Sequence, residues 1–448
     1  MSPVAGLNQA EQIPKPAGDT FVISGGGSLS GKVRLAGAKN ATTKMIVASL
    51  LTDEECVLEN FPAIGDAVIV KELCGLIGST FEESPSILKI KTPEIKNTTV
   101  TSLSRRNRIP ILTVGPLLAR AGEAEVPLVG GDKIGARPVD IHLTALEALG
   151  AEIEVREKSY LVRAKNGLRG AVIPLRYPSI GATENIILSS VLASGRTVIQ
   201  NSAIEPEIID LIKMLQKMGA IIELGANRQI YIEGVKRLRG VRHRILPDRN
   251  EAVSFACLAL ATAGDVLVEG AIQDHLITFL NICRRIGGEY EVSNEGIRFW
   301  RKDELRPIVL EPDTHPGFMT DWQQPLCVIL TQAQGNSVIH ETVYEDRFHY
   351  TEDLNLMGAR ITLSKECLGE LPCRFKNSEY FHSARIAGPI PLHGASIKVP
   401  DLRAGMAHVI AALIAEGESV IHGVSEIDRG YECIDGRLMN LGAKIKRV

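Results

Sequence analysis

The sequence has few aromatic residues and little excess charge. Phenylalanine, tyrosine and tryptophan make up 4% of the 448 residues, whereas hydrophobic residues as a whole make up 45%. Any large core must therefore be built from aliphatic side chains. The formal net charge is −3, which provides no general attraction to nucleic acid or to an anionic membrane. A site for an anionic ligand would have to form locally.

Long apolar runs and closely paired cysteines are also missing. Runs such as 253–263 are too short to cross a bilayer. Residues 1–18 lack the basic start and apolar stretch of a signal peptide, so we expect a cytoplasmic protein with a flexible N-terminal tail over these residues. None of the eight cysteines forms a C-x-x-C pair, and only Cys367 and Cys373 are close in sequence, which argues against a metal framework. We expect buried free thiols in a reducing compartment.

A short pattern recurs six times along the chain. An apolar helical stretch ends at a glycine and a strand follows, with glycines at 78, 150, 219, 287, 358 and 442. In one copy, Ile208, Leu211 and Leu215 share a helical face, and Gly219 supplies a left-handed helix stop. Upstream elements give each unit the order β-α-β-α-β-β. Six such units predict a solenoid or two domains of three units, and the repeat alone would equally suit a scaffold that only binds partners.

One loop places a single carboxylic acid between a glycine pair and an arginine. Residues 128–140 read LVGGDKIGARPVD. The glycine pair permits close approach to a ligand, and Arg137 is a forked donor for phosphate or carboxylate. A carboxyl group beside a bound anion is kept protonated, because a like charge disfavours its ionised form. Asp132 is therefore a candidate general acid.

Several predicted strand-to-helix junctions also carry charged residues. Lys39 and Asn40 precede an apolar helix whose N-terminus would assist anion binding, although a solvated lysine is common at such a place. Asp321 is either a helix N-cap or a base for a hydroxyl group. Residues 178–185 have a turn and capping pattern.

Arginines cluster in two further kinds of segment. The run at 105–108 is typical of a solvated face, and the acid–arginine neighbours at 345–348, 401–403 and 428–431 are usually weak surface pairs. Yet comparable junctions of different repeats carry a cation, and cations gathered at one point would bind an anion strongly. These cations are Lys39, Arg137, Arg403 and Arg429.

Together these motifs resemble the UDP-N-acetylglucosamine 1-carboxyvinyltransferases, a family of enolpyruvyl transferases. The resemblance runs from about residue 21 to the C-terminus. It rests on GAKN at 37–40, GGDKIGARPVD at 130–140, PSIGATE at 178–184, HPGFMTDWQQP at 315–325, PDLR at 400–403 and DRGYE at 428–432. The residues at 315–325 and 341–357 are similar to the sequences of an actinobacterial-like branch of the family.

The resemblance implies an α/β fold of the enolpyruvyl transferase type. This fold is a two-domain inside-out α/β barrel, with three repeats per domain, helices inside and sheets outside. Domain one would span 39–246, and domain two would combine 19–38 with 247–448. The active site would lie in the cleft between the domains, which substrate closes.

The activity implied is transfer of the enolpyruvyl group of phosphoenolpyruvate to the 3′-hydroxyl of UDP-N-acetylglucosamine, with release of phosphate. This is the first committed step of peptidoglycan precursor synthesis and needs no metal or organic cofactor. Matching positions for phosphoenolpyruvate are Lys39, Asn40, Arg137, Arg403 and Arg429. Those for the nucleotide are Arg108, Arg137, Pro138, Val139, Asp140, Ile141, Tyr177, Pro178, Ser179, Ile180, Asp321 and Val343. The catalytic positions are Lys39, Asp132 as acid and Asp321 as base.

Two positions depart from the family pattern. Most members have cysteine where this chain has Asp132, and a carboxyl group needs a raised pKa to stay protonated at neutral pH. Aspartate is also a poorer soft nucleophile, so we expect insensitivity to fosfomycin, which alkylates that cysteine. Tyr177 replaces a lysine of some members.

Two alternatives to this function remain open. The chain could transfer the enolpyruvyl group to another acceptor, either shikimate 3-phosphate or a different uridine nucleotide, or it could be a non-catalytic repeat scaffold.

Overall fold

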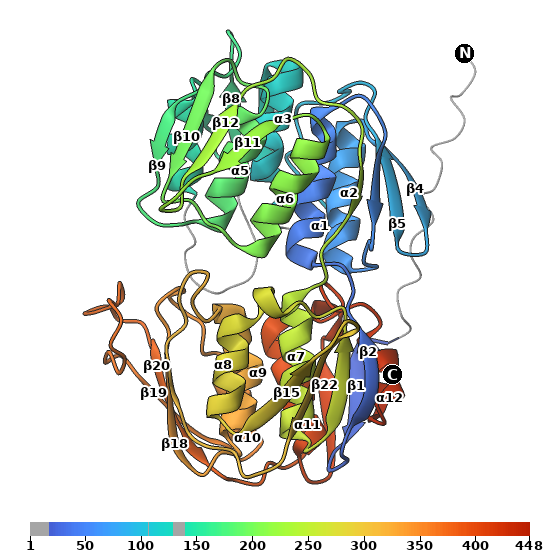
Figure 1. Cartoon of the computed structure of the whole chain (residues 1–448), viewed down its shortest axis with the longest axis vertical. Helices are drawn as coiled ribbons and strands as arrows, with labels where there is room; N and C mark the ends of the chain where they lie inside the picture. Colours follow the sequence, from blue (N-terminus) through green and yellow to red (C-terminus); the bar gives the residue numbers. More distant parts are fainter. Residues whose placement is uncertain (1–17, 106, 129–138) are drawn as a thin grey trace.

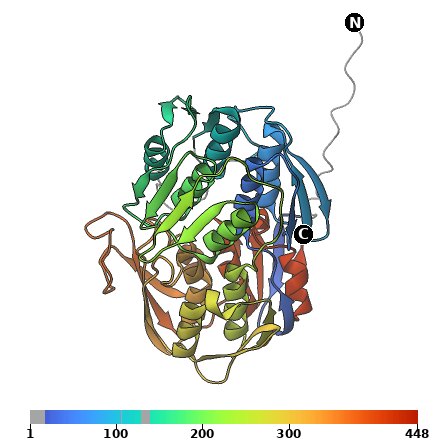
Figure 2. The ribbon, with the colours of Figure 1, turned by 45° about the horizontal axis from the view of Figure 1, so that its top comes forward.

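The chain forms two stacked halves that share one architecture. The computed structural model describes residues 18–105, 107–128 and 139–448, so the predicted N-terminal tail lies almost entirely outside the described residues. Figures 1 and 2 show one half formed by the blue-to-green part of the chain. The other half is formed by the yellow-to-red part together with the first blue strands. In both halves, helices fill the interior and sheets lie around them.

Six apolar helices form the centres of the two halves. In the first half α3 contacts both α1 and α5, and in the second half α7, α9 and α11 contact one another. All residues of α7 and α9 are buried, as expected for helices that are apolar on every side. The inner helices are α1 (Lys39–Ala48), α3 (Pro110–Ala121), α5 (Ile180–Ser190), α7 (Arg249–Ala261), α9 (Gln323–Leu330) and α11 (Leu402–Ile414).

Six amphipathic helices pack outside the inner ones, and the repeat glycines follow them. All six glycines have positive φ, from 92° to 133°, so the predicted left-handed stop is confirmed. The predicted face of α6 is also confirmed, because Ile208 and Leu211 are buried while Lys213 is exposed. These helices are α2 (Gly65–Ile77), α4 (Asp140–Ala148), α6 (Pro206–Lys217), α8 (Ile277–Arg285), α10 (Tyr350–Leu356) and α12 (Ile434–Asn440).

The strands of the described residues form six small sheets, three in each half. One sheet shows a whole unit, in the chain order β9-α5-β10-α6-β11-β12. Its strand β10 is parallel to β9 and antiparallel to β12. The predicted β-α-β-α-β-β order and the inside-out α/β barrel fold are therefore confirmed. The four strands are β9 (Val172–Pro174), β10 (Arg196–Gln200), β11 (Ile221–Leu224) and β12 (Ile230–Glu233).

Four of the other five sheets also have four strands with one parallel pair, whereas one three-stranded sheet is antiparallel throughout. Two more lie in the first half. One contains β13 (Arg242–Arg244), β3 (Cys56–Glu59), β5 (Ile87–Lys91) and β4 (Thr80–Ser84), and the other contains β6 (Glu123–Pro127), β8 (Ser159–Arg163) and β7 (Glu152–Val155). Three lie in the second half. The first contains β21 (Ser396–Lys398), β22 (Glu418–His422), β1 (Thr20–Ser24) and β23 (Lys444–Arg447), and the second contains β15 (Gly288–Val292), β16 (Gly296–Arg301), β14 (Asp265–Glu269) and β2 (Ser30–Arg34). The third contains β17 (Val309–Leu310), β18 (Gly335–His340), β20 (Ser383–Gly388) and β19 (Arg360–Ser364).

The chain passes between the halves at two adjacent points. Strands β1 and β2 pair with β22 and β14, so residues 20–34 lie in sheets of the second half. The backbone N–H of Ala38 donates to Leu246 O at 2.8 Å, which joins the outgoing and returning segments. A Cβ on Gly37 would lie 2.0 Å from the carbonyl oxygen of Asn60. Glycine is therefore required for this close approach, and it precedes Lys39 at the start of α1.

Buried apolar side chains form two separate cores. One core draws on residues 38–246 and the other on residues 21–35 and 252–445. The first core is aliphatic, with Phe61 as its one buried aromatic residue among those described. In the second core, Phe279 and Phe318 each make an edge-on contact with Trp322. The expectation of aliphatic packing therefore describes the first half better than the second.

The cysteines do not all follow the expectation of buried thiols. Cys56, Cys74, Cys257, Cys283 and Cys327 are buried. The expectation is wrong for Cys367 and Cys433, which are exposed, and for Cys373, which is half-buried, because these three lie in loops outside the cores. No helix within the described ranges combines the length and apolar character needed to cross a membrane.

Candidate active site

The N-terminal ends of all six inner helices meet at one cavity. It has a volume of about 380 Å³ and is lined by residues of both halves. Each helix N-terminus carries partial positive charge from its unpaired backbone N–H groups. Six of them converging on one space favour a bound anion. The lining residues at these ends include Lys39, Ile109, Ile180, Arg249, Asp321 and Leu402.

Most of the residues predicted for the site line this cavity. They are Lys39, Asn40, Arg108, Ile141, Tyr177, Pro178, Ser179, Ile180, Asp321, Val343 and Arg403. Val139 and Asp140 are not part of its described lining, and the Asp140 carboxylate pairs with Arg176. Asp132, Arg137 and Pro138 lie outside the described residues.

Asp321 is held by two arginines of its own half. It lies in the short helix Thr320–Trp322, directly before α9. One carboxylate oxygen accepts from Arg347 at 2.6 Å and the other from Arg403 Nε at 3.2 Å. Asp321 caps neither helix, so the N-cap alternative is wrong. Arg347 and Arg403 are both buried, which also corrects the expectation of weak surface pairs for these two.

The pKa of Asp321 reflects opposing effects. Burial alone would raise it, but Arg403, Arg347 and Lys39 outweigh burial and lower it below the ordinary value of 3.8. Asp321 is therefore ionised at neutral pH and can accept a proton. The same cations make it a weak base, so a bound anion that neutralised Arg403 and Lys39 would strengthen it.

A second carboxylate, Asp66, is held by cations from both halves. It lies in the first turn of α2. Lys39 Nζ lies 2.9 Å from one carboxylate oxygen, and Arg429 Nε lies 2.8 Å from the other. Backbone bonds tie the same segments together, since the N–H of Gly65 donates to Asp428 O at 2.9 Å. No motif in the sequence drew attention to Asp66.

The electrostatics at Asp66 are strong. Burial would raise its pKa, but Lys39 and Arg429 lower it to about 2. Lys39 lines the cavity and Arg429 does not. The two cations are brought together because both pair with the Asp66 carboxylate. The structure thus brings two of the four predicted anion-binding cations, Lys39 and Arg429, to one place and pairs them with an internal carboxylate.

At the part of the cavity lined by Tyr177 and Val343, the two halves are linked by Arg374, a residue that the sequence did not single out. The guanidinium of Arg374 lies 5.0 Å from the centre of the Tyr177 ring and donates to Val343 O. Nearby, the Ser179 hydroxyl accepts from the N–H of Ala182 at 3.3 Å and caps α5. The capping expectation is therefore confirmed for Ser179, although the residue also lines the cavity.

Arg105 also differs from expectation. The charge run predicts a solvated side chain, but Arg105 is only partly exposed and pairs with Glu426 of the other half. Arg106 lies outside the described residues.

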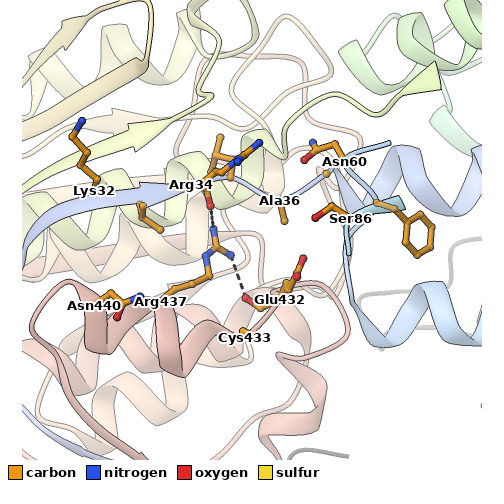
Figure 3. A pocket seen from close by; sticks show the side chains of 13 residues that line it. Lys32, Arg34, Ala36, Asn60, Ser86, Glu432, Cys433, Arg437 and Asn440 are labelled. Atoms are coloured by element: carbon orange, nitrogen blue, oxygen red, sulfur yellow. Dashed lines mark hydrogen bonds between the residues drawn. The ribbon is translucent and has the colours of Figure 1, made fainter. Parts of the chain in front are cut away.

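A second cavity, shown in Figure 3, lies between β2 and α12 and has a volume of about 520 Å³. Its central cation is already occupied. Arg437 donates to Arg34 O at 2.7 Å and pairs with Glu251 at 2.7 Å. Lys32, on its rim, pairs with Glu295 at 2.7 Å. The cavity at the helix N-termini, by contrast, has the chemistry of an anion site.

Comparison with known proteins agrees with this geometry. Residues 23–438 match the family model described as EPSP synthase (3-phosphoshikimate 1-carboxyvinyltransferase). The chain belongs to this family of enolpyruvyl transferases. Among solved structures, the enolpyruvyl transferase NikO from Streptomyces tendae has a TM-score of 0.82 at 22% identity, covering 96% of this chain and 99% of that one. That likeness supports the fold.

Curated relatives narrow the family further. The UDP-N-acetylglucosamine 1-carboxyvinyltransferase of Protochlamydia amoebophila is 49% identical over 96% of this chain and 94% of its own length. The enzyme of the same name from Chlamydia pneumoniae is 48% identical over 95% and 94%. The chain thus groups with UDP-N-acetylglucosamine 1-carboxyvinyltransferases. These relatives are chlamydial, and the actinobacterial-like branch stays a prediction.

Proposed function

We propose that this enolpyruvyl transferase moves the enolpyruvyl group of phosphoenolpyruvate to the 3′-hydroxyl of UDP-N-acetylglucosamine and releases phosphate. This reaction would commit sugar nucleotide to peptidoglycan. The observation that carries the proposal is an ionised carboxylate, Asp321, held in a cavity where six helix N-termini meet. The names of the curated relatives support the choice of acceptor.

We propose that the two substrates use different walls of the cavity. Phosphoenolpyruvate would bind Lys39, Asn40, Arg137, Arg403 and Arg429. Its phosphate would take the place of Asp66 between Lys39 and Arg429, because a dianion attracts both cations more strongly than one carboxylate does. The nucleotide would contact the wall at Arg108, residues 137–141, residues 177–180 and Val343.

The proposed chemistry uses two acids in opposite protonation states. Asp132 protonates C3 of phosphoenolpyruvate, which makes C2 electrophilic. Asp321 accepts the proton of the 3′-hydroxyl as its oxygen bonds to C2, and a tetrahedral ketal forms. Loss of a C3 proton and cleavage of the bond from C2 to the phosphate oxygen then release phosphate and the enolpyruvyl ether. The surrounding cations contribute orientation and preorganised charge.

Asp132 defines a testable variant of this site. We propose that bound phosphate raises its pKa, and that the chain represents an aspartate-loop, actinobacterial-like form. Fosfomycin should not inactivate the wild type, whereas Asp132→Cys should become sensitive, because a thiolate is the better soft nucleophile. Time-dependent inactivation assays measure both. Rapid covalent modification of wild-type Asp132 would contradict this prediction.

We also propose that the two cores mark two domains with the predicted boundaries, 39–246 and 19–38 plus 247–448. The separate sets of buried residues support this division. The two adjacent crossings near Gly37 and Leu246 would then be the hinge over which the cavity closes.

A phosphate-release assay tests the proposed function. The full-length protein is incubated with phosphoenolpyruvate and UDP-N-acetylglucosamine, shikimate 3-phosphate or UDP-glucose in parallel. We expect phosphate release and a product of the right mass only with UDP-N-acetylglucosamine. Release with shikimate 3-phosphate instead would transfer the assignment to the activity that names the family model. No release with any acceptor would support a scaffold.

A further inference from the structure

A cluster of cysteine and histidine side chains lies in the loop between β19 and β20. Figure 1 shows this loop, residues 365–382, projecting from the side of the second half. Cys367, Cys373 and His340, the last residue of β18, each place one potential ligand atom within 4.8 Å of the others. His382, where the loop returns to β20, places Nε2 3.5 Å from Cys367 Sγ. None of these four residues lines the candidate active site.

Hydrogen bonds determine which nitrogen of His340 carries the proton. The Ser383 hydroxyl donates its only hydrogen to Glu366 O at 2.6 Å. It must therefore accept from His340 Nδ1, which lies 2.8 Å away. This leaves a lone pair on His340 Nε2, and that buried atom has no hydrogen-bond partner within the described part of the chain. A buried lone pair without a donor calls for a ligand.

The other side chains are prepared in the same way. His382 Nδ1 donates to Tyr380 O at 2.9 Å, so its Nε2 presents a lone pair toward Cys367. Backbone partners of this kind orient metal-binding histidines. Cys373 Sγ accepts from the N–H of Phe375 at 3.3 Å. This contact fixes the position of the sulfur beside the other potential ligands.

We propose that Cys367, Cys373, His340 and His382 bind one zinc ion. Two sulfurs and two imidazole nitrogens are a common ligand set of structural zinc sites, whereas magnesium and calcium prefer oxygen. Two such ligands of a tetrahedral zinc lie about 3.6 Å apart, close to the 3.5 Å between Cys367 Sγ and His382 Nε2. The cysteine spacing alone argues against a metal framework, and it does not reveal this site because His340 comes from β18 and His382 from the end of the loop, just before β20.

The ion would hold a long loop that contains no helix or strand. Residues 365–382 have no regular structure, and a metal that ties the loop to β18 offsets the entropy of ordering it. Arg374 is next to Cys373 and reaches Tyr177 and Val343 in the cavity wall. The zinc site would thus position Arg374 at the nucleotide wall. This consequence rests on the proposed function, whereas the metal site itself does not.

Metal content of the full-length protein tests the site without any activity assay. The protein is purified with reductant and without chelator, and zinc is measured by mass spectrometry. We expect about one zinc per chain in the wild type and less than about 0.1 in the Cys367→Ser/Cys373→Ser double variant. Cys433→Ser is the matched control, because Cys433 is also exposed but lies far from the loop in sequence, and it should retain the ion.

A cobalt spectrum keeps the test decisive if the double variant does not fold. Cobalt added to the metal-free wild type should give visible bands of a tetrahedral ion and a thiolate charge-transfer band. His340→Ala and His382→Ala should each weaken cobalt binding at least about tenfold. Absence of the thiolate band, equal zinc in the wild type and the double variant, or a Cys367–Cys373 disulfide that persists in reductant would each overturn the proposal.

Discussion

Two carboxylates at the candidate active site are each held by two cations, but the cations come from different places. Asp321 pairs with Arg347 and Arg403, which belong to its own half. Asp66 pairs with Lys39 of its own half and with Arg429 of the other half. We infer that the first group is a base kept in place throughout the reaction. We infer that the second is an anion site, because its cations are shared between the halves and would exchange Asp66 for phosphate.

The largest effect is expected when the proposed base is removed. Asp321→Asn keeps the shape but cannot accept a proton, so we expect kcat to fall about 10²- to 10⁴-fold, with a much smaller change in KM for phosphoenolpyruvate. Steady-state phosphate release measures both constants, and the melting temperature checks folding. Asp274→Asn, an exposed aspartate of the same half, is the control. An unchanged kcat would remove Asp321 from this role.

Removing a cation of the other group should instead affect binding. Arg429→Gln deletes a charged donor, so we expect KM for phosphoenolpyruvate to rise about 10- to 100-fold, more than kcat falls. The matched control is Arg298→Gln, a half-exposed arginine that pairs with Asp265 on the outer sheet. A loss confined to kcat would place Arg429 with the base rather than with the anion.

Replacing Asp66 tests the second group through stability. Its folded pKa of about 2 lies below the unfolded value of about 3.9. The ionised form therefore contributes about 2–3 kcal/mol, fully present above about pH 4 and lost as pH falls through about 2. Asp66→Asn should lower the free energy of unfolding most at pH 7 and less at pH 3, as measured by urea titration. A difference that does not depend on pH would contradict the assigned pKa.

The smallest effect is expected from a partly exposed contact between the halves. Arg105 pairs with Glu426 while its side chain is 39% exposed. Exposed pairs contribute about 0–1 kcal/mol, so Arg105→Ala should lower the melting temperature by less than about 4 °C. Calorimetry of this variant and of Asp66→Asn gives the comparison directly. A larger loss from Arg105→Ala would mean that the exposed contact, rather than the buried one, joins the halves.

The repeat could be predicted from the sequence because local chemistry determines it. Each repeat glycine follows an amphipathic helix and has positive φ, and glycine adopts that conformation at little cost. The inner helices were predictable for a similar reason, since helices that are apolar on all sides must be buried. Lys39 and Asp321 could be proposed as site residues because they stand where such helices begin.

The missed residues depend on contacts between distant parts of the chain. Asp66 looks like an ordinary acid in the first turn of a helix, and only the fold brings Arg429 to it. Arg347 looks like one member of a surface pair, yet it is buried against Asp321. Cys367 and His340 are likewise adjacent only after β18, β19 and β20 have paired. Sequence spacing carries no information about such contacts.

The most direct test of the central claim is an experimental structure with phosphoenolpyruvate and UDP-N-acetylglucosamine bound to the Asp321→Asn variant. We predict that Lys39 and Arg429 leave Asp66 and contact the phosphate, while Arg347 and Arg403 stay at position 321 beside the 3′-hydroxyl. An anion bound elsewhere, or Lys39 and Arg429 still paired with Asp66 in the complex, would contradict the account.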